Sequence, residues 1–342
     1  MLTRWQTRFL LLPLLSLACL SVAQDPGKER DKEKDNQKDK APCDSAVEPI
    51  YRSAVSEVRV TFFATDESNH ALQTLTTSDF AIVDNERVVR NFRSLTHSDE
   101  ASLDVVVMVD LSESVSPNFR VAIGDVLRMV ALEQSIADDN IAVLSFGGTP
   151  GETPKRTFDI RPALLCSSGC RASDSLAKLQ AAKSGGLTPL FDALVFAADF
   201  ISKHGPANGR SEVRPVVILF SDGNDTISLH SASQALQALL QAGALIYSAD
   251  VGAPDRPTSG SVFLRQISAA TGGRYFSPRF TLNDDAASLL NAVLEDLRAS
   301  YVVTYDLPSH QAGFHALRLL PTRNPNLRFH SRNGYNYDPR EQ

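Results

Sequence analysis

The sequence predicts an α/β fold: a doubly wound, mostly parallel sheet flanked by helices, joined to a small β-sandwich-like domain. Two observations predict it. Between residues 102 and 300, short apolar runs alternate with segments of helical periodicity, the pattern of a parallel sheet covered by helices. Residues 50–100 and 301–337 contain strand patterns alone, and each is too short to be stable separately. We therefore expect the two ends of the chain to pair into one domain, with the middle inserted as its own.

The two β segments contain short strand candidates. Residues 58–64, 80–83 and 87–92 fit strands in the first segment, and Asp84-Asn85 between the last two predicts a hairpin turn. In the second segment, the candidates are residues 301–305, 315–320 and 326–330, with prolines between them. Neither segment shows a helical period.

The middle of the chain supplies the α/β pattern. Strands are expected at residues 104–110, 141–146, 216–221, 245–250 and 274–276, with an antiparallel edge strand at 157–160. Helices are expected at residues 119–134, 191–202, 231–242, 262–271 and 284–299. Sheets of this class bind ligands beyond the carboxyl ends of their strands, where the strand order reverses. Polar residues that end a strand are therefore the first candidates for a site.

Five oxygen-bearing side chains meet this condition. Asp110 ends an apolar run and is followed at alternate positions by Ser112 and Ser114; Asp222 ends another strand, before a glycine; Thr188 lies in a glycine-containing loop just before a predicted helix. Hydroxyls and carboxylates without nitrogen or sulfur suit a hard cation that takes about six oxygens. The pattern predicts a Mg²⁺ or Mn²⁺ site with one position left open for a ligand.

The order and spacing of these residues resemble the metal-ion-dependent adhesion site of von Willebrand factor type A domains. The resemblance covers about residues 102–300, and the flanking β segments are similar to those of a bacterial group of secreted proteins related to that family. It implies that Ser112 and Ser114 bind the metal directly and that Asp110 acts through water. It further implies that Thr188 and Asp222 exchange direct and water-mediated contact when a ligand arrives.

The resemblance implies a protein-binding or cell-adhesion module without catalytic activity. A shell of neutral hydroxyls leaves the cation electrophilic, so that an Asp or Glu of a protein partner completes the coordination. Glu113, between the two serines, departs from the pattern and is expected at the surface. The identity of the partner and the oligomeric state are not specified by the sequence.

Other interpretations of the same residues remain open. Ser112, Ser114 and Thr188 could serve only as helix caps. A Mg²⁺-dependent phosphoryl-transfer enzyme would use Asp110 as nucleophile with Asp222 or Asp225 on the metal, although Ser112 stands where such enzymes need a second aspartate. A serine hydrolase lacks its G-x-S-x-G elbow. A scaffold with a vestigial metal site is the third alternative.

The amino terminus predicts export. Arg4 and Arg8 precede an apolar stretch at residues 9–20, and small residues precede a cleavage site after Ala23, the layout of a signal peptide at residues 1–23. Lipidation at Cys19 or an uncleaved anchor are the alternatives. Residues 24–49 form a charged, disordered linker in which both signs alternate. The mature chain is expected in the periplasm, at the cell surface or secreted, with no span of the membrane.

The net charge and the cysteines of the chain bear on its partners and on its disulfide bonds. The net charge of −6, with no strongly basic segment after residue 40, argues against nucleic acid as a partner. In an oxidising compartment, Cys166 and Cys170 are expected to form a bridge, leaving Cys43 over; three free thiols are the alternative. Asp225 and Asp250 also follow apolar runs, and surface turn roles are expected for both.

Overall fold

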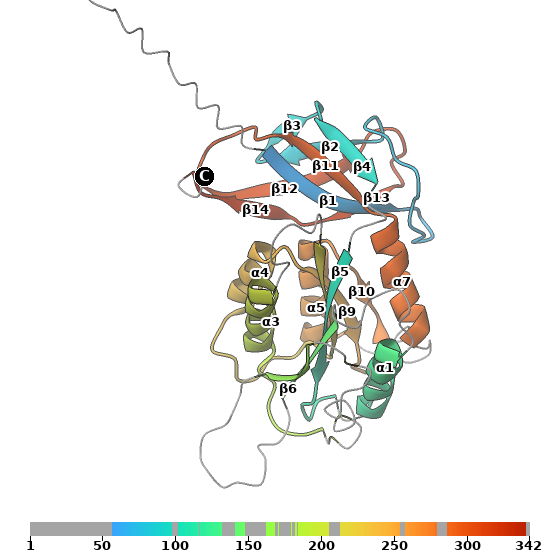
Figure 1. The fold of residues 1–342 in the computed structure, drawn as a ribbon, viewed down its shortest axis with the longest axis vertical. Coiled ribbons are helices and arrows are strands. Elements are labelled where there is room, and N and C mark those ends of the chain that lie inside the picture. Colours follow the sequence, from blue (N-terminus) through green and yellow to red (C-terminus); the bar gives the residue numbers. More distant parts are fainter. Residues whose placement is uncertain are drawn as a thin grey trace, which may run out of the picture. The chain divides into compact units, whose positions relative to one another are not determined.

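The computed structural model describes the folded body of the chain (Figure 1). The described residues are 57–97, 102–115, 117–131, 141–147, 162–167, 170, 179, 182, 184–204, 213–253, 257–278 and 286–339. The chain divides into two compact units, Met1–Arg52 and Ser53–Gln342, and every described residue belongs to the second. The predicted signal peptide, the linker and Cys43 therefore lie outside the described residues.

A six-stranded sheet forms the α/β region, in the order β10-β9-β8-β5-β6-β7. All neighbours in it are parallel except β6 and β7, which are antiparallel. The chain extends the sheet first from β5 to one side and then, from β8 onward, to the other, so the strand order reverses between β5 and β8. The strands are β5 (Ser102–Asp110), β6 (Ile141–Phe146), β7 (Ala163–Cys166), β8 (Val213–Ser221), β9 (Leu245–Asp250) and β10 (Tyr275–Phe276).

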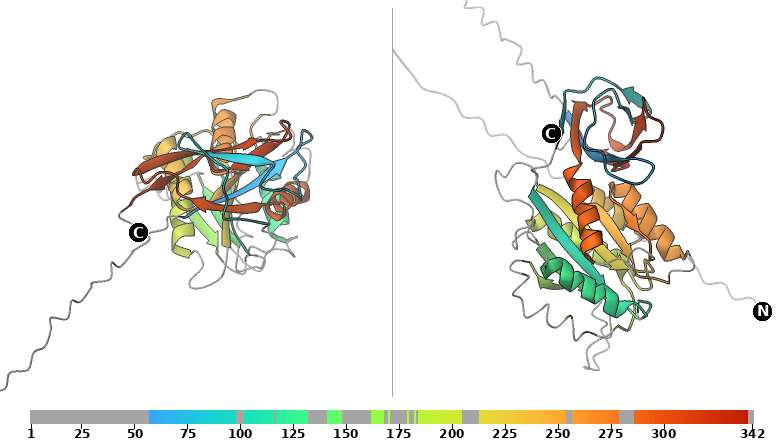
Figure 2. Two further views of the ribbon diagram at one scale, coloured as in Figure 1. Left: turned by 90° about the horizontal axis from the view of Figure 1, so that it is seen from above. Right: turned by 90° about the vertical axis from the view of Figure 1, so that its right-hand side faces the viewer.

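Helices cover both faces of this sheet, which explains why its strands are continuously apolar. On β5, Val107 packs in a core cluster with Ile123 of α1 (Phe119–Ala131) and Val293 of α7 (Ala286–Arg298). The next residue, Met108, belongs to a second cluster on the opposite face. There α3 (Leu190–His204), α4 (Ala232–Gln241) and α5 (Ser259–Thr271) contribute Leu194, Leu239 and Leu264 (Figure 1). Seen from the side in Figure 2, α1 and α7 lie in front of the sheet.

The two ends of the chain form two antiparallel four-stranded sheets, ordered β13-β1-β11-β4 and β14-β12-β2-β3. We call these strands the β lobe. The amino-terminal β1 pairs with the carboxyl-terminal β11 from Glu57↔Asp306 to Phe62↔Tyr301, and a separate apolar cluster includes Val60, Ile82 and Leu317. The lobe contains β1 (Glu57–Thr65), β2 (Phe80–Asp84), β3 (Arg87–Val89), β4 (Ser94–His97), β11 (Tyr301–Asp306), β12 (Gly313–Pro321), β13 (Arg328–Ser331) and β14 (Gly334–Tyr337).

The predicted fold class is thus confirmed, and its elements differ in detail. Two strands, β4 and β14, were not expected from the sequence: β4 is exposed or half-buried throughout, and β14 starts at a glycine where an added Cβ would lie 2.2 Å from the Phe314 ring. The expected edge strand at 157–160 lies outside the described residues. In the described part of the sheet, β7 holds the antiparallel edge position.

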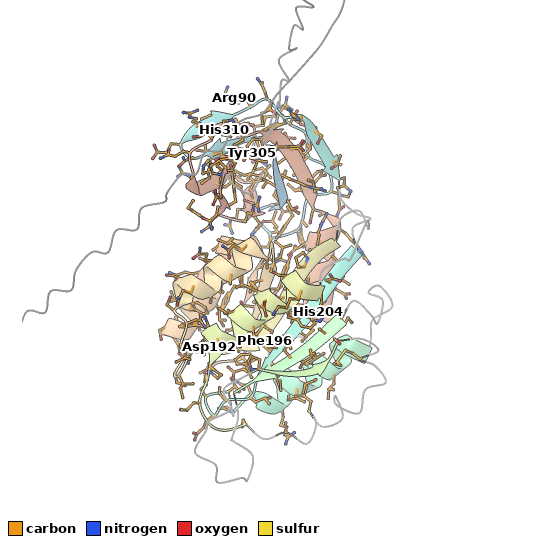
Figure 3. The ribbon with its side chains drawn as sticks, turned by 60° about the vertical axis from the view of Figure 1, so that its left-hand side comes forward. Arg90, Asp192, Phe196, His204, Tyr305 and His310 are labelled. Carbon is orange, nitrogen blue, oxygen red and sulfur yellow. A yellow bond between two sulfur atoms is a disulfide. The ribbon has the colours of Figure 1, made fainter. Side chains whose placement is uncertain are left out.

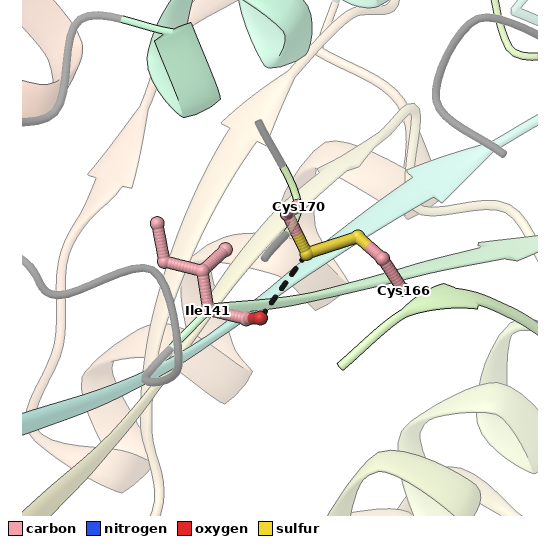
Figure 4. The surroundings of a disulfide bond; sticks show 3 residues. All are labelled: Ile141, Cys166 and Cys170. Atoms are coloured by element: carbon pink, nitrogen blue, oxygen red, sulfur yellow. Dashed lines mark hydrogen bonds between the residues drawn. A yellow bond between two sulfur atoms is a disulfide. The ribbon is translucent and has the colours of Figure 1, made fainter. Parts of the chain in front are cut away.

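The predicted disulfide is present. Cys166, the last residue of β7, is bonded to Cys170, with 5.6 Å between their Cα atoms (Figure 4). Both cysteines are buried in the cluster that contains Val107. Cys170 Sγ lies 3.2 Å from the Ile141 carbonyl oxygen, a contact rather than a donated bond because a bridged sulfur carries no proton. The bridge therefore joins the end of β7 to Cys170, whose sulfur lies against the start of β6.

Candidate metal-binding site

The first site loop begins where β5 ends. Asp110 is 1% exposed; its Oδ1 accepts the Ser112 N–H at 2.8 Å and its Oδ2 accepts the Ser221 hydroxyl at 2.7 Å. Ser112 is fully buried, whereas Ser114 is exposed, and their Oγ atoms are 3.1 Å apart. The Glu113 side chain is exposed, as expected. This loop therefore presents two adjacent hydroxyls in front of an oriented, buried carboxylate.

The second site loop, residues 184–188, is tied to the first by backbone hydrogen bonds. Gly185 N–H donates to the Leu111 carbonyl at 2.9 Å, and Glu113 N–H donates to the Gly186 carbonyl at 3.3 Å. Thr188 follows, 2% exposed, and its N–H donates to Thr226 Oγ1 at 2.7 Å. The structure thus ties Gly185 and Gly186 to the loop that carries both serines, and it ties the Thr188 backbone to Thr226 in the loop after β8.

Gly147 supports both of these loops from the end of β6. Its φ of 75° lies in the left-handed region that favours glycine. A Cβ added there would lie 3.0 Å from Ser112 N and 3.3 Å from the Leu187 carbonyl oxygen. The two loops therefore approach each other over a position that has little room for a side chain.

The third site loop follows β8. Asp222 is 6% exposed, and its carboxylate accepts Asn224 N–H at 3.1 Å and Asn224 Nδ2–H at 2.9 Å. Gly223 has φ 78°, and a Cβ on it would lie 2.3 Å from the Gly260 carbonyl oxygen. The turn therefore packs directly against the backbone of α5, which fixes Asp222 at the carboxyl edge of the sheet.

The charge of Asp222 acts on the buried carboxyl group of Asp110. Burial raises the pKa of Asp110 to about 6; hydrogen bonds from Ser112 and Ser221 oppose that rise, and the charge of Asp222 adds to it. Two buried carboxylates at one sheet edge favour a bound cation, which would offset their repulsion. The described residues contain no group of three or more His, Cys, Asp or Glu that could hold a metal. A metal at this edge therefore depends on hydroxyl ligands, and an all-oxygen donor set fits Mg²⁺ or Mn²⁺.

Helix capping at α3 belongs to other residues than Thr188. The Phe191 N–H donates to Asp225 Oδ2 at 3.1 Å and the Asp192 N–H donates to Ser228 Oγ at 3.1 Å. Asp192, labelled on α3 in Figure 3, in turn accepts the N–H groups of Leu229 and His230. Asp225 is half-buried and caps a helix, so the surface position expected for it was wrong; its turn role is present, because its Oδ1 accepts the Ser228 N–H at 3.2 Å.

Asp250 was also expected at the surface and is instead fully buried. Its Oδ1 accepts the Gly252 N–H at 2.8 Å, and its Oδ2 accepts the hydroxyls of Ser261 and Tyr275, both at 2.7 Å. The reason is that α5 covers the end of β9. A Cβ on Gly252 would lie 3.5 Å from Asp222 Cβ, so Asp250 holds a loop that packs beside the site.

Ser221 is the site residue that sequence reasoning missed. It orients Asp110 from the neighbouring strand, and its Oγ also accepts the Gly223 N–H at 3.0 Å. Its signal in the sequence is a polar residue at the end of an otherwise apolar strand, directly before Asp222. Nothing local shows that its partner lies 111 residues away.

Comparison with known structures gives distant similarities. An aerotolerance-related membrane protein from Bacteroides fragilis is 14% identical, covering 58% of this chain and 98% of that one (TM-score 0.40). Manganese-loaded TRAP protein from Plasmodium vivax is 15% identical, covering 75% and 99% (TM-score 0.38). Proximal thread matrix protein 1 from the mussel byssus, with a zinc-occupied MIDAS motif, is 16% identical, covering 62% and 49% (TM-score 0.40). Scores this low carry no argument about function.

Comparison of the sequence itself is decisive for the family. No curated protein matches the chain. The family model of the von Willebrand factor type A domain matches residues 104–293, which is more than half of the chain and includes every residue of the candidate site. The chain therefore belongs to the von Willebrand factor type A domain family.

Proposed function

We propose that this chain is a metal-dependent protein-binding module. Asp110, Ser112, Ser114, Thr188 and Asp222 would hold Mg²⁺ or Mn²⁺, and an Asp or Glu side chain of a partner protein would complete the coordination. The observation that supports this most strongly is the pair of serine hydroxyls 3.1 Å apart, one buried and one exposed, in front of a buried aspartate. They lie where the strand order reverses, the position at which such sheets bind ligands.

Asp110 and Ser114 would have different roles in binding the metal and its ligand. Asp110 is fixed by Ser112 and Ser221 and supplies negative charge from behind the hydroxyls. Ser114 is exposed and gives a ligand access from solvent. The bound metal would supply a Lewis-acid centre for the carboxylate of the partner. Because a charge-assisted contact of this kind is strong and directional, the surrounding loops would set specificity.

The contacts of Asp110 favour binding over phosphoryl transfer. A nucleophilic aspartate has to reach a substrate, whereas Asp110 is 1% exposed and both its oxygens accept hydrogen bonds. For a serine hydrolase, Ser112 Oγ would need a histidine base; its described contact is with Ser114 Oγ. A scaffold with a vestigial metal site would not require the carboxylate of Asp110 to be held in one orientation. In this structure, Ser221 of β8 holds it by a hydrogen bond.

We also propose a domain organisation and a location. Residues 1–23 would be a signal peptide, 24–49 a linker, 50–100 with 301–337 a β domain, and 102–300 the type A domain. The separate apolar cluster of the β lobe supports this division. Export to the periplasm, cell surface or medium is supported by the Cys166–Cys170 bridge. Within the described residues, no helix has the length and apolar character needed to cross a membrane.

Metal-dependent capture tests the proposed function. The full chain is immobilised with Mg²⁺, exposed to an envelope extract and eluted with EDTA, beside an Asp110→Ala control. The proposal expects a protein that EDTA releases and that the variant does not retain. A partner held equally well by the variant, or in EDTA, contradicts it. Turnover of a generic phosphate ester that Asp110→Asn abolishes would favour the enzyme instead.

A further inference from the structure

The first turn of α3 takes its cap from a loop that follows a different strand. Ala193 N–H donates to the Pro189 carbonyl at 3.0 Å, so Pro189 occupies the N-cap position of this helix. The side chain of Pro189 has no oxygen that could accept a hydrogen bond. The next two N–H groups that an N-cap side chain usually accepts belong to Phe191 and Asp192. They therefore need acceptors from elsewhere in the chain.

Asp225 and Ser228 of the third site loop supply these acceptors. Asp225 Oδ2 accepts the Phe191 N–H at 3.1 Å. Ser228 Oγ accepts the Asp192 N–H, also at 3.1 Å. Asp225 in turn fixes Ser228, because it accepts both the N–H of that residue, at 3.2 Å, and its hydroxyl. A carboxylate at the start of a helix is further favoured by the helix dipole. Asp225 is therefore the residue that organises the cap.

The third site loop also holds the residue that precedes this helix start. Thr226 N–H donates to the Thr188 carbonyl at 2.9 Å, and Thr188 N–H donates to Thr226 Oγ1 at 2.7 Å. In the opposite direction, the carboxylate of Asp192 accepts the N–H groups of Leu229 at 3.0 Å and His230 at 2.9 Å (Figure 3). The loop after β8 and the start of α3 are thus joined at several points.

The hydroxyl of Thr188 is left unused by these contacts. Thr188 is 2% exposed, and its printed sequence neighbours bond through its backbone N–H and carbonyl. Within the part of the chain that the structure describes, no hydrogen bond involves Thr188 Oγ1. The Phe191 N–H, which a threonine near a helix start could accept, is already bonded to Asp225. A hydroxyl in so buried a residue normally has a partner, and a metal ligand is a role that fits this one.

We propose that Asp225 is a positioning residue of the candidate metal site. By capping α3 from the loop that carries Asp222, it leaves the Thr188 hydroxyl free for the metal and holds Thr188 in register with Asp222. Asp225 would not touch the metal itself, because its two oxygens are engaged by Phe191 and Ser228. The inference rests on the proposed function, since it assigns Asp225 a part in that same site.

Titration of Mn²⁺ into the full chain by calorimetry tests the proposal. Asp225→Ala removes the cap, and we expect the Mn²⁺ affinity to fall about tenfold or more. Ser231→Ala is the matched control, because Ser231 caps the neighbouring α4 and accepts the Gln234 N–H of that helix at 3.3 Å. Urea unfolding should show a stability loss in both variants, whereas Mn²⁺ affinity should fall in Asp225→Ala alone. An equal loss of affinity in both variants would overturn the proposal.

Two milder variants separate the cap from the charge of Asp225. Asp225→Asn keeps an oxygen that can accept the Phe191 N–H but carries no negative charge, and it should bind Mn²⁺ nearly as wild type does. Ser228→Ala removes only the acceptor of the Asp192 N–H and should show a smaller loss than Asp225→Ala. If Asp225→Asn loses as much Mn²⁺ affinity as Asp225→Ala, the charge attracts the cation and the positioning role is wrong.

The wild-type titration distinguishes this inference from the proposed function. If wild type binds Mn²⁺ and Asp225→Ala binds it equally well, the positioning role of Asp225 is overturned and the metal site stands. If wild type itself shows no saturable binding of Mn²⁺, both are overturned. Binding by wild type that is weakened in Asp225→Ala and restored in Asp225→Asn supports both.

Discussion

Ser221 donates a hydrogen bond of 2.7 Å to Asp110 Oδ2 and thereby joins the ends of β8 and β5. These are the neighbouring strands between which the sheet order reverses, paired in parallel up to Val109↔Phe220. The bond therefore connects the two loops that carry the aspartates of the candidate site. Ser221 is not one of the five residues expected to bind the metal, so its effect on the site can be tested separately from theirs.

Replacing Ser221 should weaken the metal site without unfolding the chain. In Ser221→Ala, Asp110 loses the donor that orients Oδ2, and we expect a loss of about ten- to hundredfold in Mn²⁺ affinity, measured by calorimetry. Ser268→Ala is the matched control, because Ser268 is buried and donates to Ser248 Oγ at 2.9 Å away from the site. An equal loss of Mn²⁺ affinity in both variants would mean that Ser221 acts through general stability.

A side chain at Gly147 should disturb both the fold and the site. Gly147→Ala forces alanine into a left-handed conformation, which costs about 1–2 kcal/mol, and its Cβ presses on Ser112 and Leu187. Gly243→Ala shares the conformation, with φ 66°, but has nothing within 4 Å of the added Cβ. Urea unfolding and Mn²⁺ titration should show a stability loss in both variants and a loss of metal affinity in Gly147→Ala alone. Retained Mn²⁺ affinity in Gly147→Ala would contradict the loop contacts.

Breaking the disulfide should cost modest stability. The bridge closes a loop of 4 residues' separation, for which chain entropy gives about 2 kcal/mol. We expect Cys170→Ser to lower the free energy of unfolding in urea by about this amount, whereas Cys43→Ser should leave it unchanged. Alkylation and mass spectrometry without reductant give a direct check. Modification of Cys166 and Cys170 in the native chain would show that the bridge is absent.

Acid should destabilise the β lobe through His330. Burial lowers the pKa of this imidazole to about 4, with smaller effects from Arg274 and Arg328; the ring stacks on Phe63 with centroids 4.5 Å apart. Because the folded pKa lies below the unfolded value, the stabilisation is complete above pH 6.5 and is lost as pH falls toward 4. Between pH 7 and 4.5 this amounts to about 2–3 kcal/mol.

Urea unfolding at those two pH values checks the effect of His330. His330→Gln should lose less stability on acidification than wild type, by roughly the amount above. His70→Gln, at a side chain that is 76% exposed, is measured beside it as the control for a histidine substitution. Identical pH dependence in His330→Gln and wild type would show that His330 titrates normally.

The sequence predicted what depends on local pattern. The apolar run from Val105 to Val109 indicates a strand that is buried on both faces of the sheet. The spacing of Asp110, Ser112 and Ser114 indicates a turn at the end of that strand. The pairing of the two chain ends could also be predicted, because neither β segment is long enough to form a stable sheet alone.

Features that depend on tertiary contacts could not be predicted in the same way. Asp250 is buried because α5 covers it, and Asp225 caps a helix that precedes it by 34 residues. The bond from Ser221 to Asp110 likewise joins residues far apart in the chain. In each case the partner is set by how the elements pack, which a run of polar or apolar residues does not encode.

The three loops at the end of β5, before α3 and after β8 are expected to form one metal site. Thermal unfolding with and without Mg²⁺ or Mn²⁺, on wild type and Asp110→Ala, tests it most directly. At a metal concentration one hundred times the dissociation constant, binding stabilises the folded chain by about 2.7 kcal/mol. We predict that metal raises the melting temperature of wild type and leaves that of Asp110→Ala unchanged, while the variant remains folded. Equal shifts in both proteins would contradict the site.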